Sequence, residues 1–293
     1  MTPPRFDVTA HRLLDNVQSA DQLDGIAAPV AKLVGRATQS TAIKNALSGT
    51  WLGHQLHPLL TDLTIGAWIG VPVVDALGGA ESARTARLLT GLGILSAVPT
   101  AASGLSDWSD TYGPDMRVGL VHALGNVTGV ALQVSSYIAR RRGRRGRGAA
   151  LSVAGLSAAA AAAYLGGHLV YSLGVGVNHT AFEHRPEDWT DVGSAVALTE
   201  SSPLRVEAHG IPVVVVKRGE RLFALSATCA HAGGPLAEGE LIDGCLRCPW
   251  HGSTFRLDDG RVVRGPAAVN QPVWDVRIHE ASLQVRARRS PSE

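Results

Sequence analysis

Two segments decide the fold of the C-terminal part of the chain: CAHAGGPL at residues 229–236 and CPWHGSTF at residues 248–255. Each segment contains one Cys-His pair among glycines and prolines, Cys229 with His231 and Cys248 with His251. Loops rich in glycine turn tightly enough to bring two such pairs to one centre. Because Cys-x-His is too short for the usual zinc-finger spacing, we expect a binuclear metal site, and a structural zinc ion is the alternative.

Short apolar runs rich in valine surround these loops and alternate with turns that contain glycine. The runs are residues 211–217, 221–226, 241–246, 273–278 and 282–285. This alternation is typical of a small antiparallel β domain. We therefore predict an antiparallel β-sandwich over residues 190–288, followed by a disordered tail at 289–293.

The two Cys-His loops resemble those of the Rieske 2Fe-2S family, and the resemblance covers roughly residues 190–287. It implies a 2Fe-2S cluster as the cofactor and electron transfer as the activity. In that family two thiolates bind one iron and two imidazoles bind the other. The resemblance assigns Cys229 and Cys248 to the buried iron. It assigns His231 and His251 to the solvent-facing iron, where their rings would form an exposed tip for electron exchange.

Four positions in the loops bear on the redox potential. Quinol-oxidising Rieske proteins carry an additional cysteine in each loop, and Gly234 and Trp250 occupy the matching positions here, so no disulfide bridges the loops. High-potential members also donate hydrogen bonds to the cluster from a serine and a tyrosine; Ser253 is kept, but Phe255 replaces the tyrosine. Fewer hydrogen bonds stabilise the reduced cluster less, so we expect a potential in the lower part of the ~−150 to +300 mV Rieske range.

Two further features lie near the loops. The segment Gly265-Pro266-Ala267 is similar to the proline-rich loop that covers the cluster in this family. The third cysteine, Cys245, falls on the strand before the second loop, where we expect it to pack in the core. A local group of three cysteines near the C-terminus favours metal chemistry over a disulfide framework.

A polar connector at residues 178–189 precedes the β domain. It contains His179 and His184, a spacing similar to part of the mononuclear iron motif of Rieske oxygenases. Gly176 stands where that motif needs an acidic ligand, and no catalytic domain follows the β domain. We therefore expect no oxygenase activity.

Four long stretches with few charges precede the connector: residues 57–77, 88–105, 118–138 and 149–175. Each reaches or nearly reaches the ~20 residues that a helix needs to cross a bilayer. We predict an all-α bundle of four transmembrane helices over residues 51–177, with a soluble bundle of buried helices as the alternative. The pairs Gly66 with Gly70 and Gly125 with Gly129 have the spacing that lets helices approach closely in lipid.

The membrane part carries a resemblance of its own. The segments GHQLHPLL at 53–60 and GGHLVY at 166–171 resemble a bacterial membrane domain of unknown function that sometimes precedes Rieske domains. This resemblance covers about residues 51–177. It implies no activity.

Three histidines lie in these helices, on one side of the bilayer by the parity of four crossings: His57, His122 and His168. Polar residues inside a membrane are costly and are candidates for function. Imidazoles from facing helices ligate haem b in bundles, so one interpretation is a haem or quinone site. The other is that each ring bonds a neighbouring carbonyl or a carboxylate such as Asp62 or Asp75. His54 is then interfacial.

The surroundings of the membrane part follow from its ends and loops. Residues 1–50 hold apolar side chains at loosely helical spacing, which predicts amphipathic or interfacial helices. The first residues lack the pattern of a cleaved signal peptide, so none is expected. The densest basic run, at residues 140–147, joins the third and fourth helices. By the positive-inside rule it is cytoplasmic, which places the cluster on the outer side of a bacterial inner membrane.

The charge balance is nearly even, with 27 Lys and Arg against 25 Asp and Glu and a net charge of +2, so a nucleic-acid partner is not expected. We predict a membrane-anchored one-electron carrier between a membrane redox partner, a protein or a quinone, and a soluble or periplasmic acceptor. One alternative is a quinol-oxidising subunit with a haem or quinone in the bundle. The other is an iron-sulfur redox sensor or accessory subunit.

Overall fold

A computed structural model describes residues 5–79 and 81–288, and the predicted tail at 289–293 lies outside the described residues. The chain forms two compact units. The helical unit comprises Met1–Gln39 and Leu56–Val175, and the β unit comprises Ser40–Gln55 and Gly176–Glu293. Residues 40–55 therefore belong with the β domain, although the sequence analysis divided them between the N-terminal segment and the membrane bundle.

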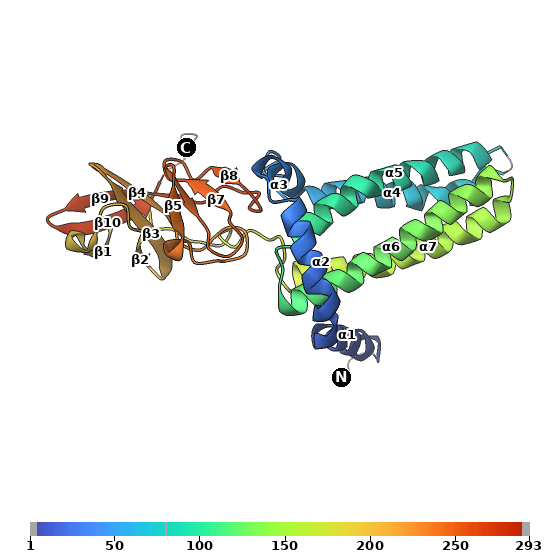
Figure 1. The fold of residues 1–293 in the computed structure, drawn as a ribbon, viewed down its shortest axis with the longest axis horizontal. Helices are drawn as coiled ribbons and strands as arrows, with labels where there is room; N and C mark the ends of the chain where they lie inside the picture. Colours follow the sequence, from blue (N-terminus) through green and yellow to red (C-terminus); the bar gives the residue numbers. More distant parts are fainter. Residues whose placement is uncertain (1–4, 80, 289–293) are drawn as a thin grey trace. The chain divides into compact units, whose positions relative to one another are not determined.

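The helical unit is built from four long helices (Figure 1). They are α4 (Leu56–Leu77), α5 (Ala83–Trp108), α6 (Gly113–Arg141) and α7 (Arg145–Tyr171). All four are long and apolar enough to cross a membrane, and only 22–28% of their most apolar windows is buried inside the protein. A helix that exposes most of its apolar surface needs a hydrocarbon environment around it. The prediction of an all-α bundle with four apolar helices is confirmed.

Small residues set the distances between these helices. A Cβ atom added at Gly125 would lie 3.0 Å from the Cβ of Ala162, and one at Gly129 would lie 3.1 Å from the carbonyl oxygen of Gly155. The α6–α7 contact therefore uses the predicted Gly125–Gly129 pair. A Cβ atom added at Gly66 would meet no atom within 4 Å, so Gly66 makes no such close helix contact.

A buried ion pair ties three of the long helices together. The carboxylate of Asp75, near the end of α4, accepts hydrogen bonds from both terminal nitrogens of Arg140 on α6, one of them at 2.9 Å. Arg145, at the start of α7, donates to the backbone carbonyl of Asp75 at 3.1 Å. Arg140 is 3% exposed at its side chain, so two members of the basic run are structural cations. Asp62, by contrast, lies on the exposed face of α4.

Two N-terminal helices pack on the start of α6. They are α1 (Arg5–Gln18) and α2 (Asp24–Ala37), joined by the 3₁₀ turn η1 (Asp21–Leu23). The guanidinium of Arg117 donates to both carboxylate oxygens of Asp24, at 2.8 and 2.7 Å, and to the carbonyl oxygen of Gln18 at 2.7 Å. Ala27 and Ala31 of α2 are buried in a cluster with Trp108 and Met116.

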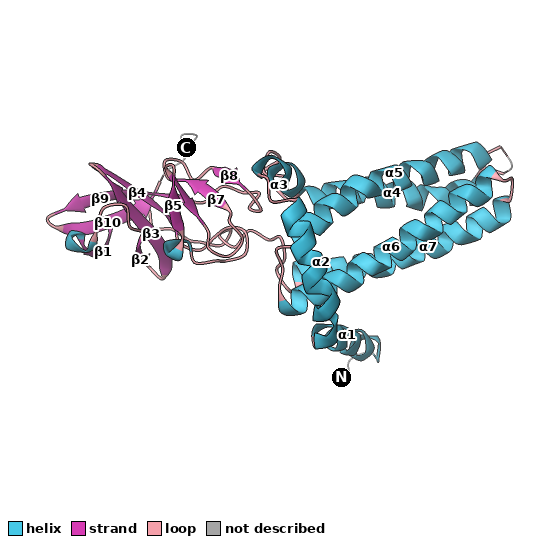
Figure 2. Ribbon diagram, viewed as in Figure 1, coloured by secondary structure: helices cyan, strands magenta, loops and turns pink. Residues whose placement is uncertain are grey.

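The β unit contains two antiparallel sheets (Figure 2). Its strands are β1 (Thr190–Ser194), β2 (Leu204–Ala208), β3 (Ile211–Arg218), β4 (Arg221–Ser226), β5 (Glu240–Ile242), β6 (Cys245–Arg247), β7 (Thr254–Arg256), β8 (Val262–Arg264), β9 (Val273–His279) and β10 (Ser282–Ala287). Six strands form one sheet in the order β1-β10-β9-β4-β3-β2, and β5-β6-β7-β8 form the other. The short 3₁₀ turns η2 (Ala195–Ala197) and η3 (Leu236–Glu238) connect strands. The predicted β domain with antiparallel sheets is confirmed.

Strand β3 is buried on both faces. Its alternating side chains divide between two cores, with Val214 and Val216 in one and Val213 and Val215 in the other. The first core also contains Cys229, Cys248 and Phe255, and the second is built around Trp274. One strand therefore carries the packing of the whole domain and of the two Cys-His loops.

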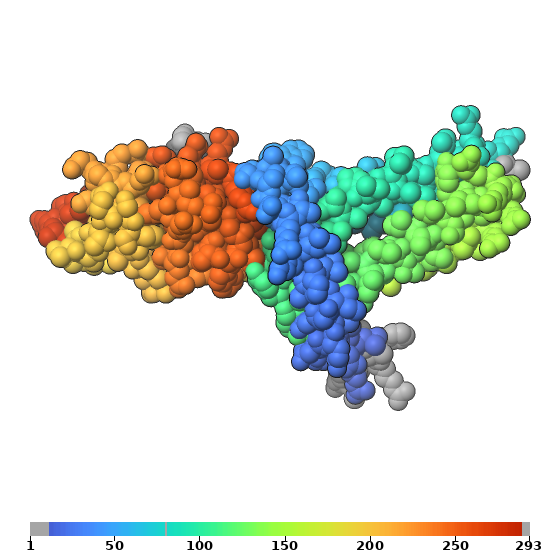
Figure 3. Space-filling view, in the orientation of Figure 1, coloured from blue at the N-terminus to red at the C-terminus, as the bar shows by residue number. Residues whose placement is uncertain are grey.

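A short helix, α3 (Thr41–Ser48), belongs to the β unit. The hydroxyl of Ser40 caps it by accepting a hydrogen bond from the N–H of Ile43. The side-chain amide of Asn45 donates to the carbonyl oxygen of Val263 at 2.9 Å and accepts from the N–H of Gly265 at 2.8 Å. Figure 3 shows this blue segment directly against the orange surface of the β unit.

We predict that Gly93→Ala destabilises the helical unit by about 1–3 kcal/mol, the usual cost of overpacking a filled interface. A Cβ atom at Gly93 would lie 2.2 Å from Nε1 of Trp68, a ring that is 2% exposed and has no free space. Thermal unfolding of the purified protein in detergent measures the effect. Gly66→Ala is the matched control because its Cβ meets no atom within 4 Å, and it should be neutral or stabilising. Equal melting temperatures for the two variants would contradict the packing at Gly93.

Candidate metal centre

The two Cys-His loops have the same backbone geometry. In the first, the N–H of Cys229 donates to the carbonyl of Gly234 at 2.8 Å, and the N–H of Gly233 returns to the carbonyl of Cys229 at 2.9 Å. In the second, the N–H of Cys248 donates to the carbonyl of Ser253 at 2.8 Å, and the N–H of Gly252 donates to the carbonyl of Cys248 at 3.1 Å. The glycine four residues after each cysteine has a positive φ, +74° and +72°, which a side chain would strain.

The equivalent loops bring like donors together. The thiols of Cys229 and Cys248 are in hydrogen-bonding contact, and both residues are buried. The imidazole rings of His231 and His251 lie edge to face with their centroids 5.1 Å apart. The four side chains therefore form a sulfur pair and a nitrogen pair.

Backbone N–H groups point at each sulfur. The N–H groups of His231 and Ala232 donate to Cys229, and those of Trp250 and His251 donate to Cys248. Such hydrogen bonds stabilise a thiolate, which is the form of cysteine that binds metals. These donors favour the thiolate form at both sulfurs, in a site with little water.

The ionisation of the four donors follows from burial and from their pairing. The hydrogen bond from Cys229 lowers the pKa of the Cys248 thiol to about 7, while the same contact raises the pKa of Cys229. Burial, with smaller contributions from His251, Lys44 and His179, lowers the pKa of His231 to about 3. His231 is therefore neutral at physiological pH, as a metal-binding imidazole must be.

These residues fit a 2Fe-2S cluster. The Nδ1 atom of His231 is buried and makes no hydrogen bond, which is costly for a polar atom unless a metal binds there. Within residues 5–79 and 81–288, no three His, Cys, Asp or Glu side chains are arranged to hold one ion. Paired sulfurs and paired imidazoles suit two metal ions better than the alternative of a single structural zinc.

Gly234 and Trp250, the positions that match the loop cysteines of quinol-oxidising members, lie against each other. A Cβ atom at Gly234 would lie 2.8 Å from the sulfur of Cys248 and 3.1 Å from the ring of Trp250. Trp250 is 53% exposed, so its ring covers the loop junction from outside. A glycine is required here because any side chain would displace the cysteine.

Ser253 and Phe255 are both fully buried beside the loops. The hydroxyl oxygen of Ser253 accepts a hydrogen bond from the N–H of Ala267 at 3.0 Å, which ties the second Cys-His loop to the segment Gly265-Pro266-Ala267. The hydroxyl hydrogen stays available for another acceptor. Phe255 lies in the core that contains both cysteines and offers no hydrogen bond.

Gln271 is a supporting residue that the sequence analysis missed. It is 2% exposed, and its amide accepts from the N–H of Ala230 at 3.0 Å and donates to the carbonyls of Ser226 and Thr228 at 2.8 and 2.6 Å. These bonds fix the first Cys-His loop from a segment that is distant in sequence. A lone glutamine between strands gives no sequence signal for this role.

The rings of His231 and His251 are less exposed than the electron-exchange tip that the sequence predicts. His231 and His251 are only partly exposed, and Lys44 of α3 is buried near His231. A small cavity of about 160 Å³ adjoins His231 and is also lined by His54 and Gln55. The expectation of an exposed tip is therefore corrected, because residues 40–55 pack beside it.

Cys245 does not lie in the core, which corrects the expectation for this residue. On β6, the inward position belongs to Leu246, which is fully buried, while Cys245 is partly exposed. Its sulfur lies 3.9 Å from the carbonyl oxygen of Asp243. The error is one of register, since adjacent residues of a strand face opposite sides.

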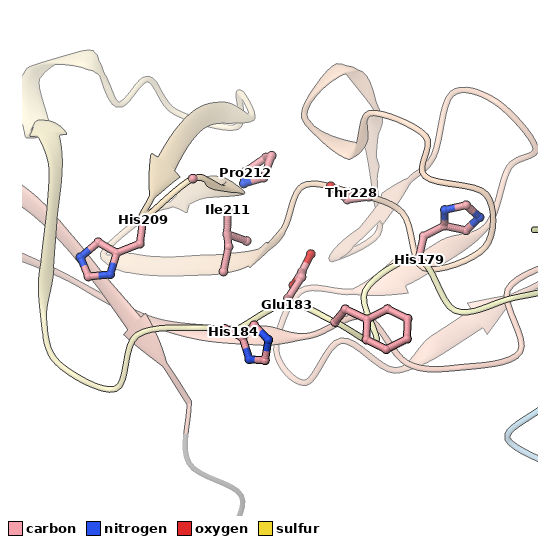
Figure 4. A pocket seen from close by; sticks show the side chains of 9 residues that line it. His179, Glu183, His184, His209, Ile211, Pro212 and Thr228 are labelled. Atoms are coloured by element: carbon pink, nitrogen blue, oxygen red, sulfur yellow. The ribbon is translucent and has the colours of Figure 1, made fainter.

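The connector lines a separate groove of about 380 Å³ (Figure 4). Figure 4 shows the rings of His179 and His184 well apart, with His209 at the other end. Between them, Glu183 accepts a hydrogen bond from the hydroxyl of Ser226, and burial raises the pKa of its carboxyl group. The two connector histidines therefore do not form a shared iron site.

The three histidines of the helical unit have different partners. Nδ1 of His57 lies 3.0 Å from the carbonyl oxygen of Thr100, and Nδ1 of His122 lies 2.7 Å from that of Ala162. The structure brings these two rings together, with centroids 6.4 Å apart. His168 instead contacts the side chain of Gln18 on α1, at 3.4 Å.

Comparisons with known proteins agree with this geometry. Residues 188–277 match the family model of the Rieske 2Fe-2S domain, and residues 53–179 match that of a predicted membrane protein domain, DUF2231. The chain is 30% identical to the anthranilate 1,2-dioxygenase ferredoxin subunit of Burkholderia cepacia over 98 residues, which is 33% of this chain and 91% of that protein. It is 28% identical to ferredoxin CarAc of Metapseudomonas resinovorans, over 34% of this chain and 95% of that protein.

Two further similarities concern the same domain. The chain is 33% identical to the cytochrome b6-f complex iron-sulfur subunit of Chlorobaculum tepidum, over 25% of this chain and 39% of that protein. The ferredoxin of carbazole 1,9a-dioxygenase from Nocardioides aromaticivorans superposes with a TM-score of 0.33 and 23% identity, covering 35% of this chain and all of that one. The Cys-His loops, the antiparallel sheets and the ferredoxin relatives together show that this chain belongs to the Rieske 2Fe-2S family, with a DUF2231 membrane domain ahead of its iron-sulfur domain.

Proposed function

We propose that this protein is a membrane-anchored Rieske electron carrier, which passes one electron at a time between a redox partner in the membrane and a soluble or periplasmic acceptor. The observation that carries the proposal is the convergence of two equivalent loops, which pairs two buried thiols and two imidazoles. The Rieske domain implies a 2Fe-2S cluster, and the cluster supplies the one-electron chemistry when bound.

In this proposal Cys229 and Cys248 hold the inner iron, and His231 and His251 hold the outer one. The backbone N–H groups aimed at the two sulfurs favour the thiolate form, although burial and the contact with Cys248 raise the pKa of Cys229, so the bound metal replaces its proton. Burial keeps His231 neutral, so its Nδ1 lone pair is available. The protein thus contributes ligation, exclusion of water and a fixed orientation.

The surroundings of the loops favour a carrier over the alternative of a quinol-oxidising subunit. That alternative needs a high potential, which its known members obtain with a loop disulfide and a tyrosine hydroxyl. Here the glycine at 234 leaves no room for a side chain, and the core residue at 255 is phenylalanine. We propose a ferredoxin-like potential in the lower part of the Rieske range, and a protein acceptor of the kind that ferredoxins serve.

We further propose that the Rieske domain lies on the outer side of a bacterial inner membrane. Arg140 and Arg145 are bound to Asp75, but four arginines of the same run remain exposed: Arg141, Arg142, Arg144 and Arg147. Exposed cations beside membrane helices favour the cytoplasm. With four crossings, both ends of the bundle then lie on the opposite side from this run.

His231→Cys should retain iron but change the EPR spectrum from the Rieske type toward that of an all-thiolate ferredoxin, because a nitrogen donor is replaced by sulfur. EPR of the reduced, purified protein in detergent measures the change. Cys245→Ser is the matched control, since this sulfur lies outside the loops, and its spectrum should equal that of the wild type. An unchanged spectrum in His231→Cys would remove His231 from the ligand set, and zinc in place of iron would end the proposal.

Ser253→Ala should lower the midpoint potential by about 20–60 mV. The estimate takes a net hydrogen bond of about 0.5–1.5 kcal/mol and about 60 mV per 1.4 kcal/mol for one electron. The reduced cluster carries more negative charge, so losing a hydroxyl donor destabilises it more than the oxidised cluster. A redox titration followed by EPR checks this value. Phe255→Tyr adds a hydroxyl donor and should raise the midpoint potential. An unchanged potential in Ser253→Ala would show that the Ser253 hydroxyl only accepts the hydrogen bond from the Ala267 N–H.

A C-terminal alkaline phosphatase fusion should be active and a C-terminal GFP fusion dark, because the proposed orientation places the C-terminus outside the cytoplasm. Replacing the four exposed arginines by alanine should weaken this orientation and raise the fraction with the opposite topology. Replacing Lys32 and Arg36 of α2 by alanine is the control, because these exposed cations precede the first crossing and lie on the opposite side from the run; it should leave the orientation unchanged. A fluorescent GFP fusion of the unmodified chain would reverse the assignment.

A further inference from the structure

Helix α3 comes before the membrane helices in the chain, yet it packs on the β unit next to the candidate metal centre. Its neighbour is strand β8 (Figure 1). The amide of Asn45 bonds to the backbone of Val263 and Gly265. A Cβ atom at Gly265 would lie 3.3 Å from side-chain atoms of Ser48 and Thr50. Residues 45–50 therefore pack directly on the segment that begins at Gly265.

The strand end beneath α3 is bonded in turn to the second Cys-His loop. Nη1 of Arg264 donates to the carbonyl oxygens of Gly252 and Gly265, at 3.1 and 2.9 Å. The same nitrogen lies 3.4 Å from the carbonyl oxygen of His251. This network fixes the place of α3 relative to the loop that carries one of the two imidazoles.

Helix α3 buries a lysine on the face that packs on the β unit. Its buried residues are Lys44 and Ser48, which lie one helical turn apart and so share a face. Ser48 contacts Gly265, as described above, and Lys44 is 3% exposed. The apolar Ile43 of the same helix is 45% exposed, which reverses the usual distribution of these two residue types. Hydrophobic burial therefore does not explain the orientation of α3.

The charge of Lys44 acts on the histidine pair. Burial is the largest cause of the lowered pKa of His231, and Lys44 adds to it by repelling the protonated ring. Because charges interact more weakly as their separation grows, this effect requires the ammonium group to lie near the imidazole. A cation removed from bulk water is also screened less than an exposed one. Lys44 therefore brings a weakly screened positive charge to this side of the site.

Such a charge affects the two oxidation states of a Rieske cluster differently. In the oxidised form, the charges of the ferric ions, the sulfides and the two thiolates cancel when the imidazoles are neutral. The added electron then leaves the reduced form with a net negative charge. A nearby cation stabilises that form more than the neutral one, so it raises the midpoint potential.

We propose that Lys44 belongs to the cluster site and raises the midpoint potential through its charge, and that Asn45 positions it by fixing α3 on the β unit. Lys44 can act in this way only in a protein that carries the cluster, so this role rests on the proposed function. Both residues lie outside the segment that matches the Rieske domain, residues 188–277. The segment ahead of the membrane helices thus completes the environment of the cluster.

The test is a redox titration of the full-length protein in detergent, followed by the Rieske EPR signal. Lys44→Met should make reduction roughly three- to tenfold less favourable, a fall of about 30–60 mV for one electron. Lys44→Arg keeps the charge and should keep the potential of the unmodified protein. Lys217→Met is the matched control. It removes a lysine four residues along β3 from Val213, whose partner Ser226 precedes the first Cys-His loop, and it should leave the potential unchanged.

A second variant tests the same place with the opposite charge. Asn45→Asp is nearly the same size and can still accept from the N–H of Gly265, but it adds a negative charge to α3. It should also lower the midpoint potential, and it decides the question if Lys44→Met does not fold. The amplitude of the Rieske signal reports whether each variant holds its cluster.

An unchanged potential in both Lys44→Met and Asn45→Asp would overturn the role of Lys44 and leave the carrier function standing. A fall in Lys44→Arg as large as that in Lys44→Met would overturn it too, because packing would then set the potential instead of charge. Absence of a Rieske signal from the unmodified protein would be a different failure, since it would overturn the proposed function and the role of Lys44 together.

Discussion

The contact between the two buried cysteine sulfurs is the constraint on which the β unit depends. It exists because both loops close with the same pair of backbone hydrogen bonds and because a glycine follows each cysteine at the same distance. Core packing around β3 then seals the sulfurs from water. Two thiolates so close together would repel each other strongly, and the N–H groups directed at them, with a positively charged metal group, offset that repulsion.

The helical unit follows a different rule. Its outer surface is apolar and largely unburied, so its polar groups must find partners inside. The Asp75–Arg140 pair does this at one end, and the bonds of His57 and His122 to backbone carbonyls do it at the other. Glycines placed against Trp68, His57 and His122 allow these large side chains to fit between helices. The bundle is thus specified by small residues as much as by apolar ones.

Much of this architecture could be predicted from sequence because the signals are local. The Cys-His spacing predicts the loop pair, and the length and hydropathy of four stretches predict the helices. What could not be predicted depends on contacts between distant residues. The Asn45 bridge to Val263 and Gly265 spans more than two hundred positions, and Gln271 reaches back to the first loop. The inward position on β6 fell on Leu246 instead of Cys245, since a three-residue strand has too little alternation to fix its register.

The place of α3 in the chain has a consequence for biosynthesis. This helix emerges from the ribosome before any of the four membrane helices, yet its partners on the β unit lie 218 and 220 residues later. With only eight residues it is too short to be stable alone. It must therefore stay unfolded, on the side where the C-terminal domain will later appear, until almost the whole protein has been made. The segment that forms α3 can then fold only after the β unit is complete. A chain that ends early would keep this segment unpaired next to its first membrane helix, where proteases can cut it.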